Sequence, residues 1–313
     1  MMVKSLKYAA LAGALALSVA TAGAAKADVY GYSNSQFSNV TLNYASGGVV
    51  DLADFSYLSF TDTVGGTAFL STSGTVTAPT VTDDFSYNGT NVIEPIDGDS
   101  LSTAVCVENG GACSPTPGTD FARTEASIEG AIVSGVRPTT GLTSVVMGES
   151  RVDGDTIGRA TSTNTSQGGV EFELELGGTG TVDLVLSLDY LIDLFVAHEI
   201  DGSIQDASAG ASFFVTILGN GSSIVLAPED LNVGVAISEE FTSAAFSETG
   251  SVLLPITLDR GVRYNFSINH TATTVVNAQL VAVPEPGTVG LLGAGLAMLG
   301  IGAIRRRRGD KAA

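Results

Sequence analysis

Two short acidic segments contain the residues whose types and spacing most plainly suggest chemistry. Asp97 and Asp99 flank a single glycine, and Asp153 and Asp155 repeat this arrangement. Carboxylates spaced in this way can hold calcium, because the cation accepts several oxygen ligands and tolerates irregular geometry. Neither segment continues into the further ligands and closing glutamate of an EF-hand loop. The favoured interpretation is an acidic turn in which Asp-Gly suits the backbone, and calcium is the one cofactor that the sequence suggests.

The two histidines give little support for catalysis. His198 precedes a glutamate, as in a zinc-protease motif, but no second histidine follows at the spacing that the motif requires. His270 lies far away in the sequence, so a catalytic group would have to be assembled in space. We therefore expect both histidines to be ordinary residues on strand surfaces. We assign no catalytic residue and expect a protein that is not an enzyme.

The two cysteines, Cys106 and Cys113, would close a small ring if they were joined. An oxidising compartment favours a disulfide, and so short a loop would gain only about 2–3 kcal/mol. A metal-binding or redox pair is the alternative. It is less favoured, because the spacing is not Cys-x-x-Cys and no histidine is near.

The N-terminus, residues 1–27, has the pattern of a secretion signal. Lys4 and Lys7 precede an apolar run over residues 8–20. Ala25 and Ala27 then form a small-x-small cleavage site, which predicts a mature protein that begins at Asp28. An earlier site at residues 22–24 is possible, and a membrane anchor is the alternative, although the apolar run is short for one.

The C-terminus, residues 284–313, has three parts in a fixed order. Pro284, Glu285 and Pro286 come first, an apolar glycine-rich stretch covers residues 289–304, and the cluster Arg305, Arg306, Arg307 and Arg308 follows. Sixteen helical residues span roughly 24 Å, somewhat less than the ~30 Å hydrocarbon core. The stretch is thus expected to be one marginal transmembrane helix with the arginines on its cytoplasmic side.

This tripartite tail resembles the PEP-CTERM sorting signal. The resemblance covers only the last 30 or so residues, but the order and spacing of the parts make it specific. It implies transient retention in the membrane of a Gram-negative bacterium and processing by an exosortase. Release to the cell surface or to an exopolysaccharide matrix would follow. A permanent tail anchor is the alternative.

The charge of the region between the two ends limits its partners. Residues 28–283 contain six arginines, no lysine and 31 acidic residues, which gives a net charge of −25. Such a charge repels nucleic acid and anionic membranes, so no nucleic-acid partner is expected. It favours solubility outside the cell, and it is compatible with divalent cations or basic partners.

Alternating hydrophobicity predicts β-strands in the second half of this region. Apolar residues alternate with glutamates over 170–176, a turn is expected at 177–180, and alternation resumes over 182–196. That second run is long for one strand, which predicts a bend or bulge inside it. Hairpins are predicted around turns at 219–222 and 259–261, and a closing strand at 275–283.

The first half is less regular, with short strands expected near 40–44, 55–60, 69–76 and 128–133. Residues 94–119 are expected to form a long loop, because they are rich in turn-forming residues. Many strands and almost no amphipathic helix predict an all-β fold. Residues 28–283 are thus expected to form an antiparallel two-sheet sandwich of jelly-roll or Ig-like type outside the cytoplasm.

The leading functional hypothesis is an exported envelope or extracellular-matrix protein, associated with exopolysaccharide in a structural or interaction role. A calcium-dependent carbohydrate-binding protein is the first alternative. The chain has no Trp for a sugar-binding platform, although Tyr30, Tyr32, Tyr44, Tyr57 and Tyr87 are available. A secreted hydrolase is the second alternative, for which no site can be named.

Overall fold

The computed structural model describes residues 29–71, 74–94, 100–108, 120–152, 159–198, 204–238 and 243–279. The predicted signal peptide, 1–27, and the predicted sorting tail, 284–313, both lie outside these ranges. Among the described residues, no helix is long and apolar enough to span a membrane. The transmembrane helix expected at 289–304 therefore stays a prediction.

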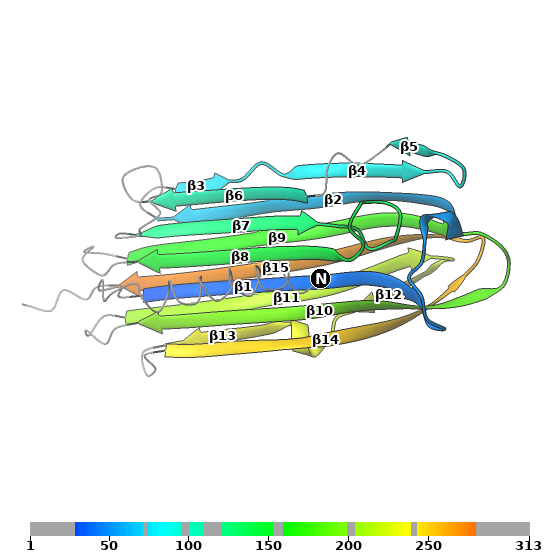
Figure 1. The fold of residues 1–313 in the computed structure, drawn as a ribbon. Helices are drawn as coiled ribbons and strands as arrows, with labels where there is room; N and C mark the ends of the chain where they lie inside the picture. Colours follow the sequence, from blue (N-terminus) through cyan, green and yellow to red (C-terminus); the bar gives the residue numbers. More distant parts are fainter. Residues whose placement is uncertain are drawn as a thin grey trace, which may run out of the picture.

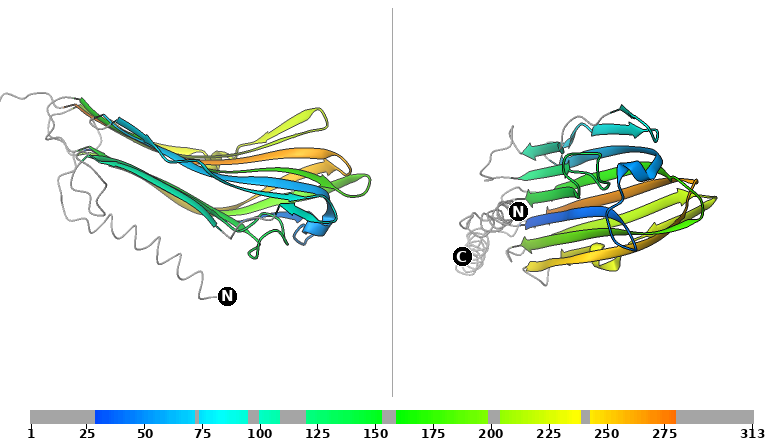
Figure 2. Two further views of the ribbon diagram at one scale, coloured as in Figure 1. Left: turned by 90° about the horizontal axis from the view of Figure 1, so that it is seen from above. Right: turned by 45° about the vertical axis from the view of Figure 1, so that its right-hand side comes forward.

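The described residues form two antiparallel β-sheets that pack face to face, as Figure 1 and the left view of Figure 2 show. The six-stranded sheet has the order β14-β10-β1-β8-β7-β6, and the nine-stranded sheet has the order β12-β11-β15-β9-β2-β4-β5. Strand β13 also pairs with β11, and β3 also pairs with β2. The prediction of an all-β fold with two antiparallel sheets is thus confirmed.

The six-stranded sheet consists of β1 (Val29–Tyr44), β6 (Ser100–Glu108), β7 (Phe121–Glu129), β8 (Leu142–Val152), β10 (Thr181–His198) and β14 (Ser243–Asp259). The nine-stranded sheet consists of β2 (Phe55–Leu70), β3 (Gly74–Thr77), β4 (Val81–Tyr87), β5 (Val92–Glu94), β9 (Arg159–Leu176), β11 (Ile204–Gly219), β12 (Ser222–Leu226), β13 (Val233–Ile237) and β15 (Arg263–Gln279). Two short 3-10 helices, η1 (Leu52–Asp54) and η2 (Glu229–Leu231), lie in connections.

One predicted hairpin is confirmed and the other is wrong. Strands β11 and β12 pair around Asn220 and Gly221, both at positive φ as a tight turn requires. Strands β14 and β15 do not pair, because β14 lies beside β10 in one sheet and β15 lies between β9 and β11 in the other. The segment between them crosses the sandwich. The connection from β9 to β10 also crosses between the sheets, and two hydrogen bonds join the two connections. Arg260 N donates to Gly180 O at 2.7 Å, and Gly261 N donates to Leu176 O at 2.9 Å.

The expected bulge lies in a different strand. Strand β10 pairs with β14 without interruption, and the register shift occurs in its other neighbour, β1, between Ser38 and Thr41. There Asn39 adopts a φ of 53°, a conformation that asparagine tolerates well, and its side-chain amide donates to Asp189 Oδ2 at 2.7 Å. The long alternating run at 182–196 therefore contains no bulge, and its partner absorbs the extra residue.

Several predicted boundaries are also wrong. The loop expected at 94–119 contains strand β6, and the strand expected at 275–283 is the end of β15, as far as the described residues reach. The strands expected at 69–76 and 128–133 run past the ends of β2 and β7, respectively, whereas those expected at 40–44 and 55–60 are parts of longer strands. Many of the missed residues are small or polar, so these segments show weaker hydrophobic alternation than residues 170–196.

The interior of the sandwich has two halves of different composition. The apolar half consists of residues 169–176 of β9 and the segments that pair with them or face them. Its largest fully buried side chains include Leu58, Leu174 and Phe266, and Phe266 stacks on Phe172 with ring centroids 4.5 Å apart. This half is a conventional hydrophobic core.

The polar half consists of residues 159–168 of β9 and the segments that pair with them or face them. Here Asn164, Ser150 and Thr274 are buried and bonded to one another, with Asn164 Nδ2 2.9 Å from Ser150 Oγ and Thr274 Oγ1 2.8 Å from the same atom. These residues come from β9, β8 and β15, so the bonds join the two sheets.

The two sheets approach closely in the polar half. The hydroxyl of Ser33 in β1 donates to the Gly210 carbonyl of β11 at 2.8 Å. A Cβ added to Gly148 of β8 would lie under 3 Å from the side chain of Asn164. Short side chains reach the opposite backbone only where the sheets lie closer than the ~10 Å of ordinary packing. Small residues are therefore required here by the spacing of the sheets.

Candidate functional site

The residues proposed for calcium lie outside the described part of the chain. Nothing is observed for Asp97, Asp99, Asp153 or Asp155, so the calcium interpretation stays a prediction. Within the described ranges, no group of three or more His, Cys, Asp or Glu side chains could hold a metal ion.

Cys106 lies in β6 and is held in a disulfide bond. Cys113 falls outside the described residues. The predicted Cys106–Cys113 pairing is consistent with this observation, and the pairing itself stays a prediction.

The expectation that both histidines lie on strand surfaces is wrong. His198 is 7% exposed and His270 is 2% exposed. Both occupy even-numbered positions in strands whose even-numbered residues point inward. Their position in this alternation could have identified them as buried. The alternation that places the apolar residues of these strands inward constrains their polar residues equally.

His270 forms a Ser–His contact in the interior. Its Nδ1 lies 3.2 Å from Ser144 Oγ, and its ring packs edge-on against Phe37 with centroids 4.2 Å apart. Burial lowers the pKa of His270 to about 3, so the ring is neutral at physiological pH. The contact is enclosed between the sheets, and a substrate in solvent cannot reach it. It therefore acts as a structural hydrogen bond.

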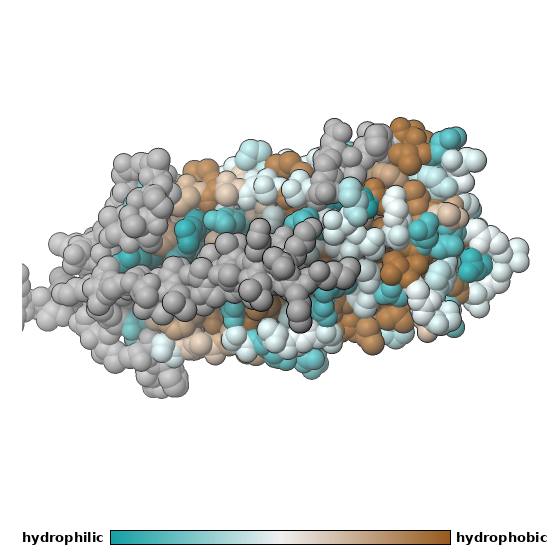
Figure 3. Space-filling view, in the orientation of Figure 1, coloured by the Kyte–Doolittle hydropathy of each residue, from teal (hydrophilic) through white to brown (hydrophobic). Residues whose placement is uncertain are grey.

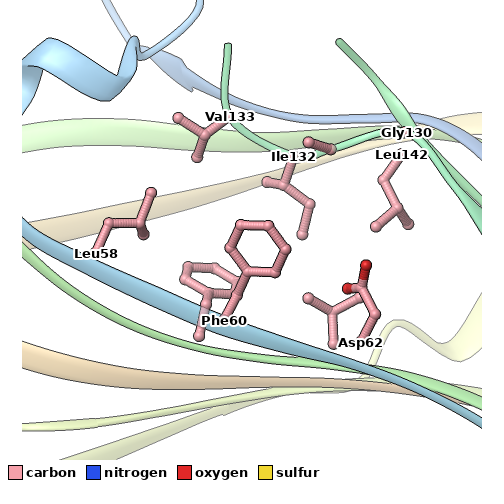
Figure 4. A pocket seen from close by; sticks show the side chains of 10 residues that line it. Leu58, Phe60, Asp62, Gly130, Ile132, Val133 and Leu142 are labelled. Atoms are coloured by element: carbon pink, nitrogen blue, oxygen red, sulfur yellow. The ribbon is translucent and has the colours of Figure 1, made fainter. Parts of the chain in front are cut away.

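A small pocket lies between β2 and the segment that connects β7 to β8 (Figure 4). Leu58, Phe60 and Asp62 of β2 face Ile132 and Leu142 across it. Asp62 is the polar side chain among the described residues that line the pocket, and burial raises its pKa to about 7. An acid of this kind can serve as a proton donor, but the space holds about one water molecule. The pocket cannot accept a substrate of ordinary size.

Asp62 instead belongs to a buried ion cluster. Its Oδ2 lies 2.8 Å from Nη2 of Arg137, and the same nitrogen lies 3.1 Å from Oδ2 of Asp83. Arg137 Nη1 also donates to the Gly130 carbonyl at 2.8 Å. Asp62 and Asp83 are direct partners across β2 and β4, a pair of like charges that would repel without the arginine. Arg137 thereby fixes the β7–β8 connection to the nine-stranded sheet.

The outer face of the nine-stranded sheet contains a block without any charged residue, which we call the hydroxyl face. It comprises four outward positions on each of four adjacent strands, β11, β15, β9 and β2. Cross-strand register places them in four rows: Ser208–Val275–Thr163–Phe69, Gly210–Thr273–Thr165–Thr67, Ser212–Thr271–Gln167–Gly65 and Phe214–Asn269–Gly169–Thr63.

The hydroxyl face is open to solvent in several places. Thr165 and Gln167 are exposed, as are Phe214 (37%) and Val275 (36%). Ser212 and Thr271 share a hydrogen bond of 2.6 Å between their hydroxyls, which orients a neighbouring pair across two strands. The face therefore presents a regular array of hydroxyl, amide and a few apolar groups. Sequence reasoning missed it, because its residues are separated by up to 212 positions along the chain.

The outer face of the six-stranded sheet is different in charge. Strand β10 carries three outward aspartates, Asp183, Asp189 and Asp193, and each accepts a hydrogen bond from a hydroxyl of β14. For example, Thr257 Oγ1 donates to Asp183 Oδ1 at 2.7 Å. Figure 3, which views the molecule from this sheet, shows hydrophilic and hydrophobic residues interspersed on its described part. The face is thus acidic along β10.

A group of aromatic and charged residues occupies one end of that face. The Tyr30 hydroxyl donates to Glu149 Oε1 at 2.8 Å, and Arg123 forms an ion pair with Glu149. The ring centroids of Tyr30 and Phe195 are 6.0 Å apart. The pKa of Tyr30 is raised well above its usual value, mainly by burial and secondly by the negative charge of Glu149. Tyr32 lies in the same region, whereas Tyr57 is on the other sheet beneath Arg263. The five tyrosines therefore do not form a single platform.

Comparison with known proteins identifies the C-terminal end of the chain. Residues 282–308 match the PEP-CTERM protein-sorting motif. The motif is that of an exported protein processed by an exosortase, and the resemblance expected for the tail is confirmed. No curated protein and no solved structure matches the chain.

Proposed function

We propose that this chain is an exported protein of the cell envelope or extracellular matrix. An exosortase-type enzyme processes its C-terminal tail, and the released sandwich associates with exopolysaccharide in a structural or interaction role. The single observation that carries the proposal is the sorting motif at residues 282–308, which begins three residues after the last described strand ends at Gln279. The sandwich and its sorting signal are therefore adjacent in the chain.

The composition of the body supports delivery outside the cell. A net charge of −25 over residues 28–283, with no lysine, keeps copies apart and in solution. The disulfide at Cys106 fits an oxidising compartment. The predicted signal peptide at 1–27 and the arginine cluster at 305–308 would place the sandwich on the outer side of the inner membrane.

A binding role rather than catalysis is supported by the positions of the described titratable groups. His270 and Ser144 are enclosed between the sheets, and Asp62 is paired with Arg137 beside a pocket with room for about one water molecule. What the sandwich offers to solvent instead is extended sheet surface. Such surfaces suit the recognition of polymers and of other proteins.

Fractionation of cells that express tail variants tests the proposal. Replacing Pro284, Glu285 and Pro286 together by alanine removes the residues expected to be recognised by the exosortase, while the apolar stretch and the arginines remain. The variant should accumulate in the membrane fraction, whereas the unsubstituted protein reaches the surface or the medium. A matched control, Asp310→Ala, lies beyond the matched motif and should be released normally. Equal release of all three proteins would contradict processing at this tail.

A further inference from the structure

The hydroxyl face stands out because the rest of the sandwich is strongly acidic. Its sixteen outward positions, four on each of four strands, carry no charge. The next outward positions of the same strand β9 are Glu171, Glu173 and Glu175. The change from threonine to glutamate occurs within a single strand, so the charge-free area has a sharp boundary.

This distribution of charge restricts what can lie against the face. A partner that covers it need not strip water from a carboxylate, which would be costly without a paired cation. An anionic polymer is repelled by the acidic residues around the face, and a basic partner finds no carboxylate to bind within it. The surface is therefore suited to a neutral partner.

The side chains have the chemistry to bind a sugar polymer. Hydroxyl and amide groups of Thr165, Thr273, Gln167 and Asn269 can both donate and accept hydrogen bonds. The exposed ring of Phe214 offers an apolar surface that a sugar ring can pack against.

The dimensions of the face suit an extended polymer. Outward positions repeat about every 4.8 Å across strands and about 6.8 Å along them, so the array measures roughly 14 Å by 20 Å. This is long enough for several consecutive sugar residues.

We propose that the hydroxyl face is a binding surface for a neutral polysaccharide. The inference rests on the proposed function, which it sharpens by naming the face and by excluding anionic polymers as its ligand. Binding arises from many weak hydrogen bonds and one aromatic contact along the face. A single carboxylate placed at its centre should disrupt it, because that charge would be desolvated without a partner.

The test compares matched variants on the two outer faces. Thr165→Glu introduces a carboxylate at the centre of the hydroxyl face. Thr249→Glu makes the same change at an exposed position of β14, opposite Leu191, on the outer face of the six-stranded sheet. Phe214→Ser and Leu253→Ser form a second pair, since Phe214 lies on the hydroxyl face and Leu253 is 68% exposed on the other sheet.

Each protein, as recovered from the cell surface or medium, is assayed by affinity gel electrophoresis. The gels contain hydroxyethylcellulose or dextran, both neutral, or alginate, which is anionic. The unsubstituted protein should be retarded by a neutral polymer. Thr165→Glu and Phe214→Ser should weaken that interaction about tenfold or more, while the two controls stay within twofold. Melting temperatures within about 3 °C of the unsubstituted protein would show that the variants are folded.

Any of three results in these gels would overturn the inference: no retardation by either neutral polymer, retardation by alginate alone, or equal retardation of Thr165→Glu and Thr249→Glu. A dimer that Thr165→Glu dissociates would also overturn it, because the face would then join two copies of the chain. All of these outcomes are independent of sorting. A protein that is released normally but fails to bind refutes the inference and leaves the proposed function intact.

Discussion

Strand β9 passes through two regions that hold the sandwich together by different means. In the apolar half, Phe172 and Leu174 point inward while Glu171 and Glu173 point to solvent. In the polar half, Asn164 and Ser166 point inward while threonines point outward. The apolar half is stabilised by burial of large side chains. The polar half is stabilised by hydrogen bonds between sheets that approach closely.

The difference shows that the polar half is constrained from both sides. Its inner face requires small residues where the sheets are close together, as at Gly148, and it must satisfy the hydrogen bonds of its buried polar groups. Part of its outer face, the hydroxyl face, carries no charge. The apolar half has the arrangement of an ordinary soluble sandwich, with a hydrophobic interior and an acidic exterior.

The largest effect is expected from a truncation in the apolar half. Phe266 is fully buried and stacks on Phe172. Phe266→Ala should destabilise the fold by about 3–5 kcal/mol, because it removes apolar burial and leaves a cavity. Urea denaturation followed by circular dichroism measures the change. A loss below about 1 kcal/mol would mean that the apolar half does not provide the main hydrophobic core.

The next effect is expected from the opposite change in the polar half, an added methyl group. Gly148→Ala would bring Cβ under 3 Å from the buried side chain of Asn164 and disturb its bonds to Ser150 and Thr274. Such overpacking costs about 1–3 kcal/mol. Gly169→Ala is the matched control, because its Cβ would meet no atom closer than 3.5 Å. Equal stability of the two variants would contradict the close approach of the sheets.

A smaller effect on the free energy of unfolding is expected from Asp62→Asn, at the boundary between the apolar and polar halves. It should be visible mainly as a change in the pH dependence of stability. Burial raises the pKa of Asp62 to about 7. The positive charge of Arg137 lowers this pKa, whereas the negative charges of Asp83 and Asp84 raise it. Between about pH 4 and 7 the folded state keeps this proton while the unfolded state loses it, so stability falls as pH rises through that window.

Asp62→Asn lacks this contribution. The unfolding free energy of the unsubstituted protein, relative to that of the variant, should therefore decrease from pH 5 to pH 8. His270, whose pKa is lowered by burial, contributes with the opposite slope at more acidic pH, but it is common to both proteins and cancels. A difference between the two proteins that stays constant with pH would refute an elevated pKa at Asp62.

The smallest effect on stability is expected on the hydroxyl face itself. Thr165 is exposed, and Thr165→Val retains its shape and strand preference. The free energy of unfolding should change by less than about 0.5 kcal/mol in thermal or urea denaturation. A large loss would show that this threonine has a structural role, and that the outer face is not free to serve binding.

Sequence reasoning predicted the apolar half well and the polar half poorly, for a physical reason. Residues 170–176 and 182–196 alternate strongly between apolar and polar, and both lie in observed strands. Residues 159–168 consist of small and polar side chains on both faces, so they produce no contrast from which to infer a strand. Strand β9 was accordingly predicted to begin at 170, eleven residues after its start.

The pairing between strands that are distant in the chain also could not be predicted from the sequence. The segment at 259–261 looks like a hairpin turn, but it crosses between the sheets, because β15 completes the nine-stranded sheet between β9 and β11. The cluster of Asp62, Asp83 and Arg137 likewise depends on three separate segments. The sorting tail, in contrast, was predicted correctly because its parts are contiguous and are recognised by their order in the chain.

The most direct test of the account is the intact mass of the protein recovered from the cell surface or the medium. The account predicts a chain that begins at Asp28 and lacks everything beyond the region of Pro284, Glu285 and Pro286. A mass that retains residues 305–313 would mean that the tail remains as a membrane anchor. That result would contradict exosortase processing and release.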